Sequence, residues 1–392
     1  MEIELWWLLV LPAFFLMGWS AARIDIKQLV KESRALPRSY FKGLNFLLNE
    51  QPDKAIEAFL EAAKVDPETI ELHFALGNLF RRRGEADRAI RVHQNLVERD
   101  NLTDEQRLHA LAELGQDYLK LGLLDRAEDI FVKLRGTTRN EEAMRILLEI
   151  YQQEKEWQKA IEIAEALPGP AGHEWIKEVA NFHCELAAGA LVGDQLDDAL
   201  KHLELALSVN RKCTRATILQ GDMALKSGDA AAAIEHWKRV EQQNPVYIAL
   251  VASKLMEAYR QLGKEAMGIQ LLRSYLEQYS SLDLLDSVFQ AEIANGNPEG
   301  AYTLVRDEVR RNPTLLGLDK LLEAQLLGAA TPERRSDLEL MKNLIHSHTR
   351  RVARYRCDNC GFKARQFYWR CPACGGWETY PPRRTEEFDL TP

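Results

Sequence analysis

The sequence has few cysteines, no excess of positive charge and no recognisable catalytic motif. Six of the 392 residues are cysteine, and four of them fall between Cys357 and Cys374, which excludes a small secreted protein built on many disulfides. The net charge is −8 and the pI is about 5.7, so the chain lacks the basic character typical of proteins that bind nucleic acids. We therefore predict no nucleic-acid partner.

The motifs of common enzyme classes are also missing. The sequence has no glycine-rich loop ending in Gly-Lys-Ser/Thr for nucleotide phosphates, and no Gly-x-Ser-x-Gly elbow for a hydrolase nucleophile. His173 and Glu174 begin a possible zinc-protease motif, but Lys177 stands where that motif requires a second histidine. Acidic pairs such as Asp197 and Asp198 are expected on solvated helix faces. These absences favour a binding protein over an enzyme.

Charged side chains are absent from residues 5–22, a run near the lower length limit for a helix that spans a membrane. A cleaved secretory signal is one alternative, because residues 20–22 (Ser-Ala-Ala) resemble a cleavage site. However, Glu2 and Glu4 stand where a signal peptide carries basic residues. A buried apolar helix is another alternative, although nothing polar interrupts the run to give it a solvated face.

The residues at the two ends of this run favour a transmembrane anchor. Trp6, Trp7 and Trp19 lie near the ends, where indole rings prefer the membrane interface. Basic residues follow the run and predict that the rest of the chain is cytoplasmic: Arg23, Lys27, Lys31, Arg34, Arg38 and Lys42. We expect a single anchor over residues 1–23, with the N-terminus on the far side of the membrane, and a juxtamembrane linker over residues 24–35.

Small and large side chains recur with a period of 34 residues. Gly43, Phe46 and Ala55 are followed by Gly77, Phe80 and Ala89. Further copies contain Gly115, Tyr118, Ala127 and Phe131; Leu147, Tyr151 and Ala160; Leu186, Ala199 and Leu203; Gly221, Ala233 and Trp237; Leu255, Tyr259 and Leu272; and Ala301 and Val305. This is the pattern of the tetratricopeptide repeat (TPR), a helix pair that must stack on its neighbours to bury its apolar face. We predict an all-α TPR solenoid of about 8–9 helix-turn-helix repeats over residues 36–346, with a capping unit at its end.

Stacked helix pairs form a concave surface that binds other proteins, and the first helix of each pair lines it. In the best-formed repeats, aromatic, polar and cationic residues occupy the positions outside the core: Phe74, Asn78, Arg81, Arg82, Gln116 and Lys120. They suit an acidic or extended peptide segment. A solvated helix face is the alternative for each residue taken singly.

Helical periodicity stops after Arg350, and two Cys-x-x-Cys pairs follow. The pairs, residues 357–360 and 371–374, are ten residues apart, and each is followed by a glycine that allows a tight turn. Two such turns can place four thiolates in a tetrahedron, as in zinc ribbons and rubredoxin-type iron sites. We predict one metal ion bound by Cys357, Cys360, Cys371 and Cys374 in a module over residues 352–385, before an acidic tail over residues 386–392.

Other cysteine chemistry fits less well. Two disulfides conflict with a reducing compartment, a redox pair needs only one Cys-x-x-Cys in a thioredoxin-like context, and an iron–sulfur cluster suits a larger module. The spacing does not distinguish iron from zinc, since both accept four sulfurs. Four protein ligands leave no open position for catalysis, so we expect a structural ion whose loss unfolds the module. Because the linker is short, we expect the module to pack on the last helices of the solenoid.

Taken together, these features resemble the bacterial lipopolysaccharide assembly protein B family, called LapB or YciM. The resemblance rests on the apolar N-terminal run, on the blocks GLNFLLNEQPDKAIEAF, LGNLFRRRGEADRAIRVHQ and LGQDYLKLGLLDRAEDIF, and on YRCDNCGF followed by YWRCPACGGW. The TPR blocks are generic when taken singly. Their order, together with the anchor and the terminal cysteine pairs, is specific.

The resemblance implies a function that no residue pattern above shows. Members of the family are inner-membrane proteins of Gram-negative bacteria that work with the membrane protease FtsH. They promote degradation of LpxC, the deacetylase that commits precursors to lipid A, and so restrain lipopolysaccharide synthesis. The inner-membrane regulator PbgA, also called YejM or LapC, is implied as an antagonist. The family's terminal module is rubredoxin-like, which implies one iron ion at the four cysteines, with zinc as the alternative.

Two other functions stay open at this point. A rubredoxin-type site could transfer electrons. The repeats could also gather lipopolysaccharide synthesis and transport components at the membrane, and this scaffolding role is compatible with that of a protease adaptor.

Overall fold

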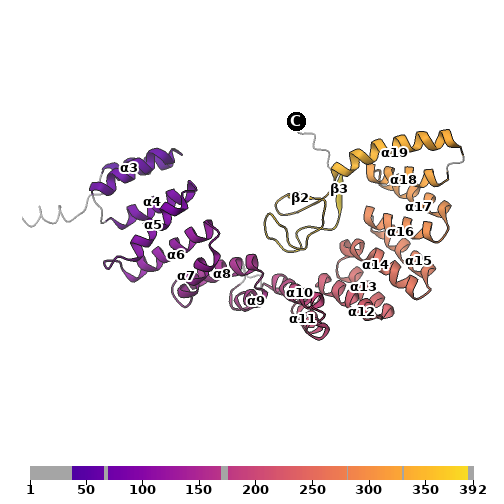
Figure 1. Ribbon diagram of the computed structural model, residues 1–392, viewed down its shortest axis with the longest axis horizontal. Helices are drawn as coiled ribbons and strands as arrows, with labels where there is room; N and C mark the ends of the chain where they lie inside the picture. Colours follow the sequence, from indigo (N-terminus) through magenta and orange to yellow (C-terminus); the bar gives the residue numbers. More distant parts are fainter. Residues whose placement is uncertain (1–37, 66–68, 169–174, 280, 329–330, 387–392) are drawn as a thin grey trace, which may run out of the picture. The chain divides into compact units, whose positions relative to one another are not determined.

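The computed structural model describes residues 38–65, 69–168, 175–279, 281–328 and 331–386. These residues form 18 α-helices, a short 3₁₀ helix and three short strands (Figure 1). The expected anchor, the expected linker and all but the first residue of the expected acidic tail lie outside the described residues. Of the helices that are described, none is both long and apolar enough to cross a membrane.

The helices follow one another as nine helix-turn-helix units in the described part of the chain, which confirms the predicted TPR solenoid. The pairs are α2 (Arg38–Leu48) and α3 (Pro52–Val65), α4 (Ile70–Arg82) and α5 (Ala86–Val97), α6 (Asp104–Lys120) and α7 (Leu124–Leu134), α8 (Asn140–Glu154) and α9 (Trp157–Ala166), α10 (Ile176–Val192) and α11 (Leu196–Val209), α12 (Thr214–Lys226) and α13 (Ala230–Gln243), α14 (Ile248–Gln261) and α15 (Glu265–Gln278), α16 (Leu282–Ala294) and α17 (Pro298–Arg311), and α18 (Leu315–Leu327) and α19 (Pro332–Val352).

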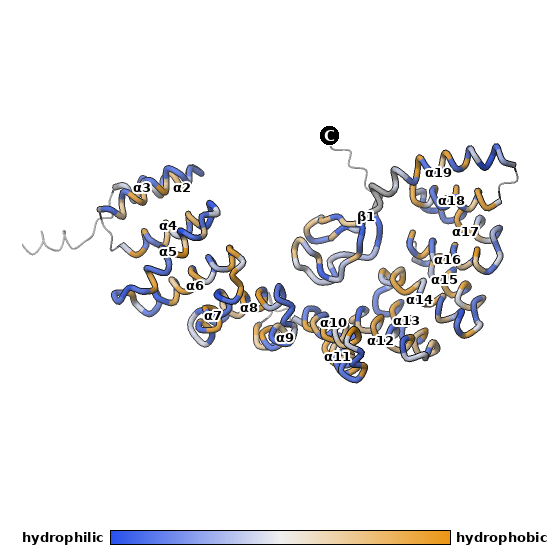
Figure 2. Tube along the Cα trace, in the orientation of Figure 1, coloured by the Kyte–Doolittle hydropathy of each residue, from blue (hydrophilic) through white to orange (hydrophobic). Residues whose placement is uncertain are grey.

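The chain divides into two compact units, Met1–Ile150 and Tyr151–Pro392, which we call unit 1 and unit 2. The division falls inside α8. Hydrophobic and hydrophilic residues alternate along the helices of both units, as expected for helices with one buried and one solvated face (Figure 2).

Close approach of paired helices depends on the predicted glycines. A Cβ atom on Gly43 would lie 2.5 Å from the ring of Phe59, and one on Gly221 would lie 2.2 Å from Nε1 of Trp237. Trp237 is 1% exposed, and its indole N–H donates to the carbonyl of Ile218 over 3.2 Å. The aromatic ring therefore fills the space that the missing side chain leaves.

One repeat departs from this pattern. His93 occupies the position that aromatic residues hold in other repeats and packs against Gly77. The ring of His93 is fully buried. Its Nδ1 atom lies 2.5 Å from Oδ2 of Asp117, a buried residue on α6 of the next repeat. The sequence does not predict this pair, because the repeat pattern specifies the size of a side chain and not its polarity.

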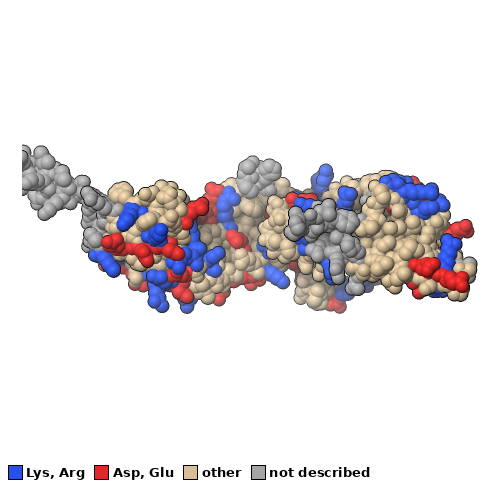
Figure 3. All heavy atoms as spheres, turned by 90° about the horizontal axis from the view of Figure 1, so that it is seen from above, with Lys and Arg blue, Asp and Glu red and all other residues tan. Residues whose placement is uncertain are grey.

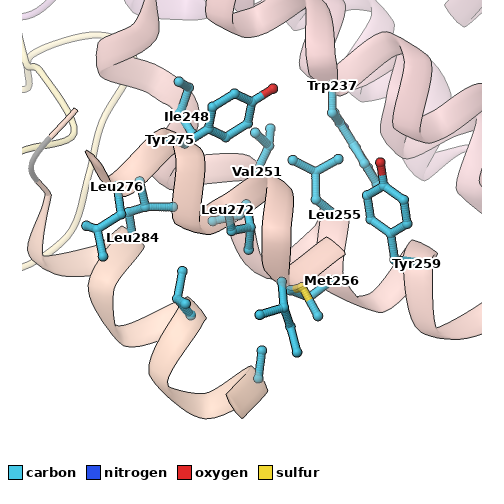
Figure 4. Close-up of a cluster of buried hydrophobic side chains, with 14 of the residues drawn as sticks. Trp237, Ile248, Val251, Leu255, Met256, Tyr259, Leu272, Tyr275, Leu276 and Leu284 are labelled. Atoms are coloured by element: carbon cyan, nitrogen blue, oxygen red, sulfur yellow. The ribbon is translucent and has the colours of Figure 1, made fainter. Parts of the chain in front are cut away.

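The main core of unit 2 lies between α12 and α18. Figure 4 shows its centre, where Trp237, Leu255 and Tyr259 approach from neighbouring helices and Leu272 packs beside them. Leu255 and Leu272 are fully buried. This core fixes the helices against which the C-terminal module packs.

The C-terminal module contains a small antiparallel sheet with strand order β2-β1-β3. The strands are β1 (Ala353–Arg356), β2 (Lys363–Ala364) and β3 (Arg384–Glu386). Tyr355 at the centre pairs with Ala364 on one side and with Arg384 on the other. Because β1 begins directly after α19 ends, the module is joined to the solenoid without an intervening loop.

Candidate metal centre

The four cysteines lie on two tight turns of the same geometry. In the first turn, the N–H of Cys357 donates to the carbonyl of Phe362, and the N–H of Gly361 donates to the carbonyl of Cys357, each over 2.9 Å. Gly361 has a φ of 75°, a left-handed conformation that disfavours any residue with a Cβ atom. The glycine after the cysteine pair is thus required by the turn.

The second turn repeats this arrangement. Cys371 donates to the carbonyl of Gly376 and accepts from the N–H of Gly375, again over 2.9 Å in both cases, and Gly375 has a φ of 70°. These are the two knuckles that the cysteine spacing and the following glycines predict.

Backbone N–H groups of each knuckle point at the sulfur atoms. The donors are Asn359 and Cys360 to Cys357, Phe362 to Cys360, Ala373 and Cys374 to Cys371, and Gly376 to Cys374. Such donors stabilise the negative charge of a thiolate and orient its lone pairs toward the centre of the site.

The sulfurs are spaced for a single tetrahedral ion. Sγ of Cys357 lies 3.8 Å from Sγ of Cys374, Sγ of Cys360 lies 3.7 Å from Sγ of Cys371, and all four atoms lie within 4.8 Å of one another. A metal–sulfur bond of about 2.3 Å requires sulfurs about 3.8 Å apart. The distances therefore fit iron or zinc equally well.

The thiols of the two knuckles differ in acidity. Burial raises the pKa of Cys357, but hydrogen bonds with Thr379 and with backbone N–H groups outweigh this effect and lower the pKa to about 6. Burial raises the pKa of Cys371 to about 12. A bound cation would compensate the charge of the thiolates that ligate it.

An aromatic shell surrounds the sulfurs. Tyr380, which sequence analysis missed, is fully buried, and its hydroxyl donates to the carbonyl of Tyr355 over 2.9 Å. Cys357 and Cys371 lie in the same cluster and are each 1% exposed, whereas Cys360 and Cys374 face solvent. With four sulfur ligands, the ion keeps no position for a substrate, so the site is suited to hold structure.

One end of the module is attached to α16 by a polar contact. Oδ2 of Asp283 accepts a hydrogen bond from the hydroxyl of Tyr355 over 3.1 Å, and Oδ1 forms an ion pair with Nε of Arg384 over 3.0 Å. Burial raises the pKa of Asp283, while Arg384 and Tyr355 oppose that rise. The contact joins β1 and β3 to the same carboxylate.

The second knuckle is attached to the helices at the start of unit 2. The indole N–H of Trp377 donates to the side chain of Gln152 over 3.3 Å, and the ring meets those of Trp157 and Phe182 edge-on at 6.0 and 5.9 Å. Its neighbour Glu378 accepts a hydrogen bond from Asn181 over 2.9 Å.

Between these two attachments, the module rests on α12 and on the 3₁₀ helix Pro245–Tyr247. Trp369 stacks on Tyr247 with ring centroids 5.0 Å apart and an interplanar angle of 13°. Arg215 of α12 lies 5.7 Å from the ring centroids of both Trp369 and Trp377, and it forms an ion pair with Glu185 over 2.8 Å.

The expected packing on the last helices is therefore only part of the contact. The module also reaches α8, α10, α12 and the 3₁₀ helix, and Figure 1 shows it within the arc of the unit 2 helices. The short linker determines where the module begins. The contacts of Trp369 and Trp377 determine the direction in which the module folds back over the solenoid.

The six residues predicted to line a partner groove belong to unit 1, and three of them are engaged within the solenoid. The ring of Phe74 meets that of His109 edge-on at 4.4 Å. Arg81 forms an ion pair with Asp117 over 2.9 Å and donates to Asn78 over 2.5 Å. These side chains stabilise the packing of α4 on α6.

The other three predicted groove residues are more accessible. Arg82 and Lys120 are exposed, and Gln116 is half-buried. In the view of Figure 3, basic and acidic side chains are interspersed over unit 1. Partner binding by these residues stays a prediction.

Comparison with known families agrees with both parts of the fold. Residues 355–382 match the rubredoxin metal binding domain, and residues 42–100 and 185–247 match the tetratricopeptide repeat. Among solved structures, the chain is similar to the TPR2AB-domain:pHSP90 complex of yeast Sti1, with 18% identity, coverage of 69% of this chain and 96% of that chain, and a TM-score of 0.33.

Curated relatives cover nearly the whole chain. Lipopolysaccharide assembly protein B of Escherichia coli K12 is 38% identical over 378 residues, which cover 96% of this chain and 97% of that protein. The protein of the same name from Haemophilus influenzae is 32% identical over 399 residues, which cover 99% of this chain and 100% of the relative. With both the repeats and the four-cysteine module inside these matches, the chain belongs to the lipopolysaccharide assembly protein B family.

Proposed function

We propose that this protein is a membrane-anchored cytoplasmic adaptor that regulates lipopolysaccharide biosynthesis. The observation that carries the proposal is a closed four-cysteine site held on a TPR solenoid. Such a structure offers surfaces for binding other proteins but no open metal position for chemistry. The names of the curated relatives support a role in lipopolysaccharide assembly.

In the mechanism that we propose, the segment 1–23 crosses the inner membrane once and holds the repeats on the cytoplasmic side. The protein brings the deacetylase LpxC to the membrane protease FtsH and so promotes LpxC degradation. The inner-membrane regulator PbgA (YejM, LapC) opposes this action. Exposed cationic residues of unit 1, Arg82 and Lys120 among them, take part in partner binding.

The metal ion in this mechanism is structural, and we propose that it is iron. Cys357, Cys360, Cys371 and Cys374 would hold it. A bound ion would hold the two knuckles together. Trp369 and Trp377, which flank the second knuckle, pack on the helices of unit 2. In this proposal, the cysteines and tryptophans of the module serve to keep it docked on unit 2 in one orientation.

The test compares the half-life of LpxC in cells that carry the full chain with that in cells that carry a chain lacking residues 1–22. We expect the deletion to lengthen the half-life, because the adaptor no longer meets the protease at the membrane. Immunoblots of both proteins control for their abundance. If the half-life of LpxC were unchanged when the full and shortened chains are equally abundant, the adaptor proposal would be wrong.

Two alternatives predict different results. A scaffold for lipopolysaccharide synthesis and transport components, which the word assembly in the relatives' names favours, predicts stable co-purification of those components. Electron transfer is favoured by the exposure of Cys360 and Cys374, which lets a redox partner approach the sulfurs. Full function of a protein loaded only with zinc would exclude electron transfer.

A further inference from the structure

The first helix of unit 1 exposes an apolar face. Phe41, Leu44 and Leu48 of α2 are 58%, 37% and 84% exposed. Their spacing places them on one side of the helix. Another side of α2 packs normally, because Gly43 lies against the ring of Phe59. The helix therefore has a buried side that builds the repeat and an apolar side that the described residues leave partly exposed.

The second and third repeats do not share this face. One period later, the same three positions hold Ala75, Asn78 and Arg82 on α4. In the third repeat, aligned on Gly115, they hold Glu113, Gln116 and Lys120. A peptide groove running along the solenoid does not explain why these positions are apolar in the first repeat and mostly polar in the next two. What distinguishes the first repeat is its place in the chain.

The sequence that precedes α2 can explain why this helix has an apolar face. Only 15 residues, 23–37, separate the uncharged run 5–22 from Arg38. Even fully extended, 15 residues span only about 50 Å, so α2 cannot lie far from the end of that run.

The charge of the sequence around the start of α2 also suits a membrane surface. The stretch from Arg23 to Lys42 contains six basic and two acidic residues, in a chain whose net charge is −8. The exposed Lys42 lies beside Phe41 at the edge of the apolar face. An apolar helix face that is bordered by a lysine and follows a basic stretch of sequence is typical of helices that lie in the interface of anionic membranes.

We propose that the face of α2 formed by Phe41, Leu44 and Leu48 rests on an anionic phospholipid surface. This contact rests on the membrane anchor of the proposed function, and it adds a second point of attachment. Contact at two points restricts the angle between the first repeats and the bilayer. The anchor then orients unit 1 as well as localising it.

Photocrosslinking of the full chain in vesicles of phosphatidylethanolamine and phosphatidylglycerol tests the contact. Benzoylphenylalanine replaces Phe41 in one protein, Phe14 of the uncharged run in a second, and the exposed Glu57 of α3 in a third. Mass spectrometry identifies the peptide that carries a phospholipid adduct. We expect adducts at positions 14 and 41 and none at position 57.

The three positions separate the possible failures. Adducts at position 14 without any at position 41 would overturn the contact and leave the anchor standing. A crosslink from position 41 to a second copy, to another protein or to the chain's own first 37 residues would also overturn it. No adduct at position 14, together with release of the protein by alkaline carbonate, would reject the anchor and the contact with it.

Charge variants test the lipid class. Lys42→Glu should lower the adduct yield at position 41 several-fold relative to position 14, and replacing phosphatidylglycerol by phosphatidylcholine should do the same. Leu48→Glu should have a similar effect and cannot disturb the core, since Leu48 is 84% exposed. Yields unaffected by all three changes would overturn the assignment to anionic lipid.

Discussion

Arg215 lies at the same distance, 5.7 Å, from the ring centroids of Trp369 and Trp377. The two tryptophans flank the second cysteine knuckle, one before Cys371 and the other after Cys374. The solenoid thus holds the module by residues whose positions depend on the metal site. Coordination of the ion and docking of the module are therefore expected to be coupled.

Replacing Arg215 with methionine should weaken docking. The substitution removes two cation–π contacts and leaves Glu185 without its ion-pair partner, so the free energy of unfolding of unit 2 should fall by about 2 kcal/mol. Urea denaturation followed by tryptophan fluorescence measures the change. Arg215→Lys should give an intermediate result, because lysine keeps the charge but not the planar group.

The matched control is Arg211→Met. Arg211 precedes α12 by a few residues and is exposed, so its replacement should change the free energy of unfolding by less than about 0.5 kcal/mol. If the two variants lowered the free energy of unfolding equally, the position of Arg215 between the tryptophans would have no special role.

Removal of the metal should unfold the module but not the solenoid. Chelation, or the substitution Cys371→Ser, should give rapid hydrogen exchange over residues 353–386 and a red shift of tryptophan emission, because Trp377 is only 4% exposed in the docked module. Helical circular dichroism should persist, since the buried residues of the main unit 2 core all lie on solenoid elements. Ala373→Ser, at an exposed position in the same knuckle, is the control. Unchanged exchange after metal loss would contradict the expected coupling.

Two helical glycines should respond oppositely to alanine. Gly221→Ala places a Cβ atom 2.2 Å from Nε1 of the buried Trp237 and should destabilise unit 2 by about 1–3 kcal/mol. Gly189→Ala meets nothing within 4 Å on α10 and should stabilise the helix by about 1 kcal/mol. In thermal denaturation, the midpoint should fall for Gly221→Ala and rise for Gly189→Ala. Similar shifts for the two variants would refute the argument that close helix approach requires glycine at position 221.

Stability should depend on pH through His183. Burial, aided by His202, lowers the pKa of His183 from 6.5 to about 4. The unfolded chain therefore binds more protons between these two values, so this contribution to stability is complete above pH 6.5 and is lost as the pH falls toward 4. Denaturation midpoints should fall less over that range in His183→Gln than in the wild-type protein.

A second variant separates the two causes. In His202→Gln, the pKa of His183, measured by NMR, should rise but stay below 6.5, because burial is the larger cause. A value restored fully to 6.5 would show that the charge of His202 dominates.

Much of the architecture could be predicted because its determinants are local or periodic. Gly43 and Phe59, or Gly221 and Trp237, are only 16 positions apart in the sequence and meet within one helix pair, so the period of 34 residues reveals them. The two knuckles were equally predictable. Each is a closed turn of a few residues, and the following glycine supplies the backbone conformation that the turn needs.

Polar substitutions inside the pattern could not be predicted in this way. His93 and Asp117 occupy positions where the period specifies size and burial, and their 2.5 Å contact joins two repeats. The same limit applies to the groove residues. Arg81 has the right spacing to line a groove, but the packing of α4 on α6 places it beside Asp117.

The sequence by itself determined the repeat period, the helix pairs and the geometry of the four sulfurs. Only the tertiary structure decided where the module rests. Tyr355 meets Asp283 across 72 residues, and Trp377 meets Gln152 across 225. Contacts over such separations depend on the accumulated rotation of every intervening repeat, and that rotation arises from side-chain packing at each interface and not from any local pattern.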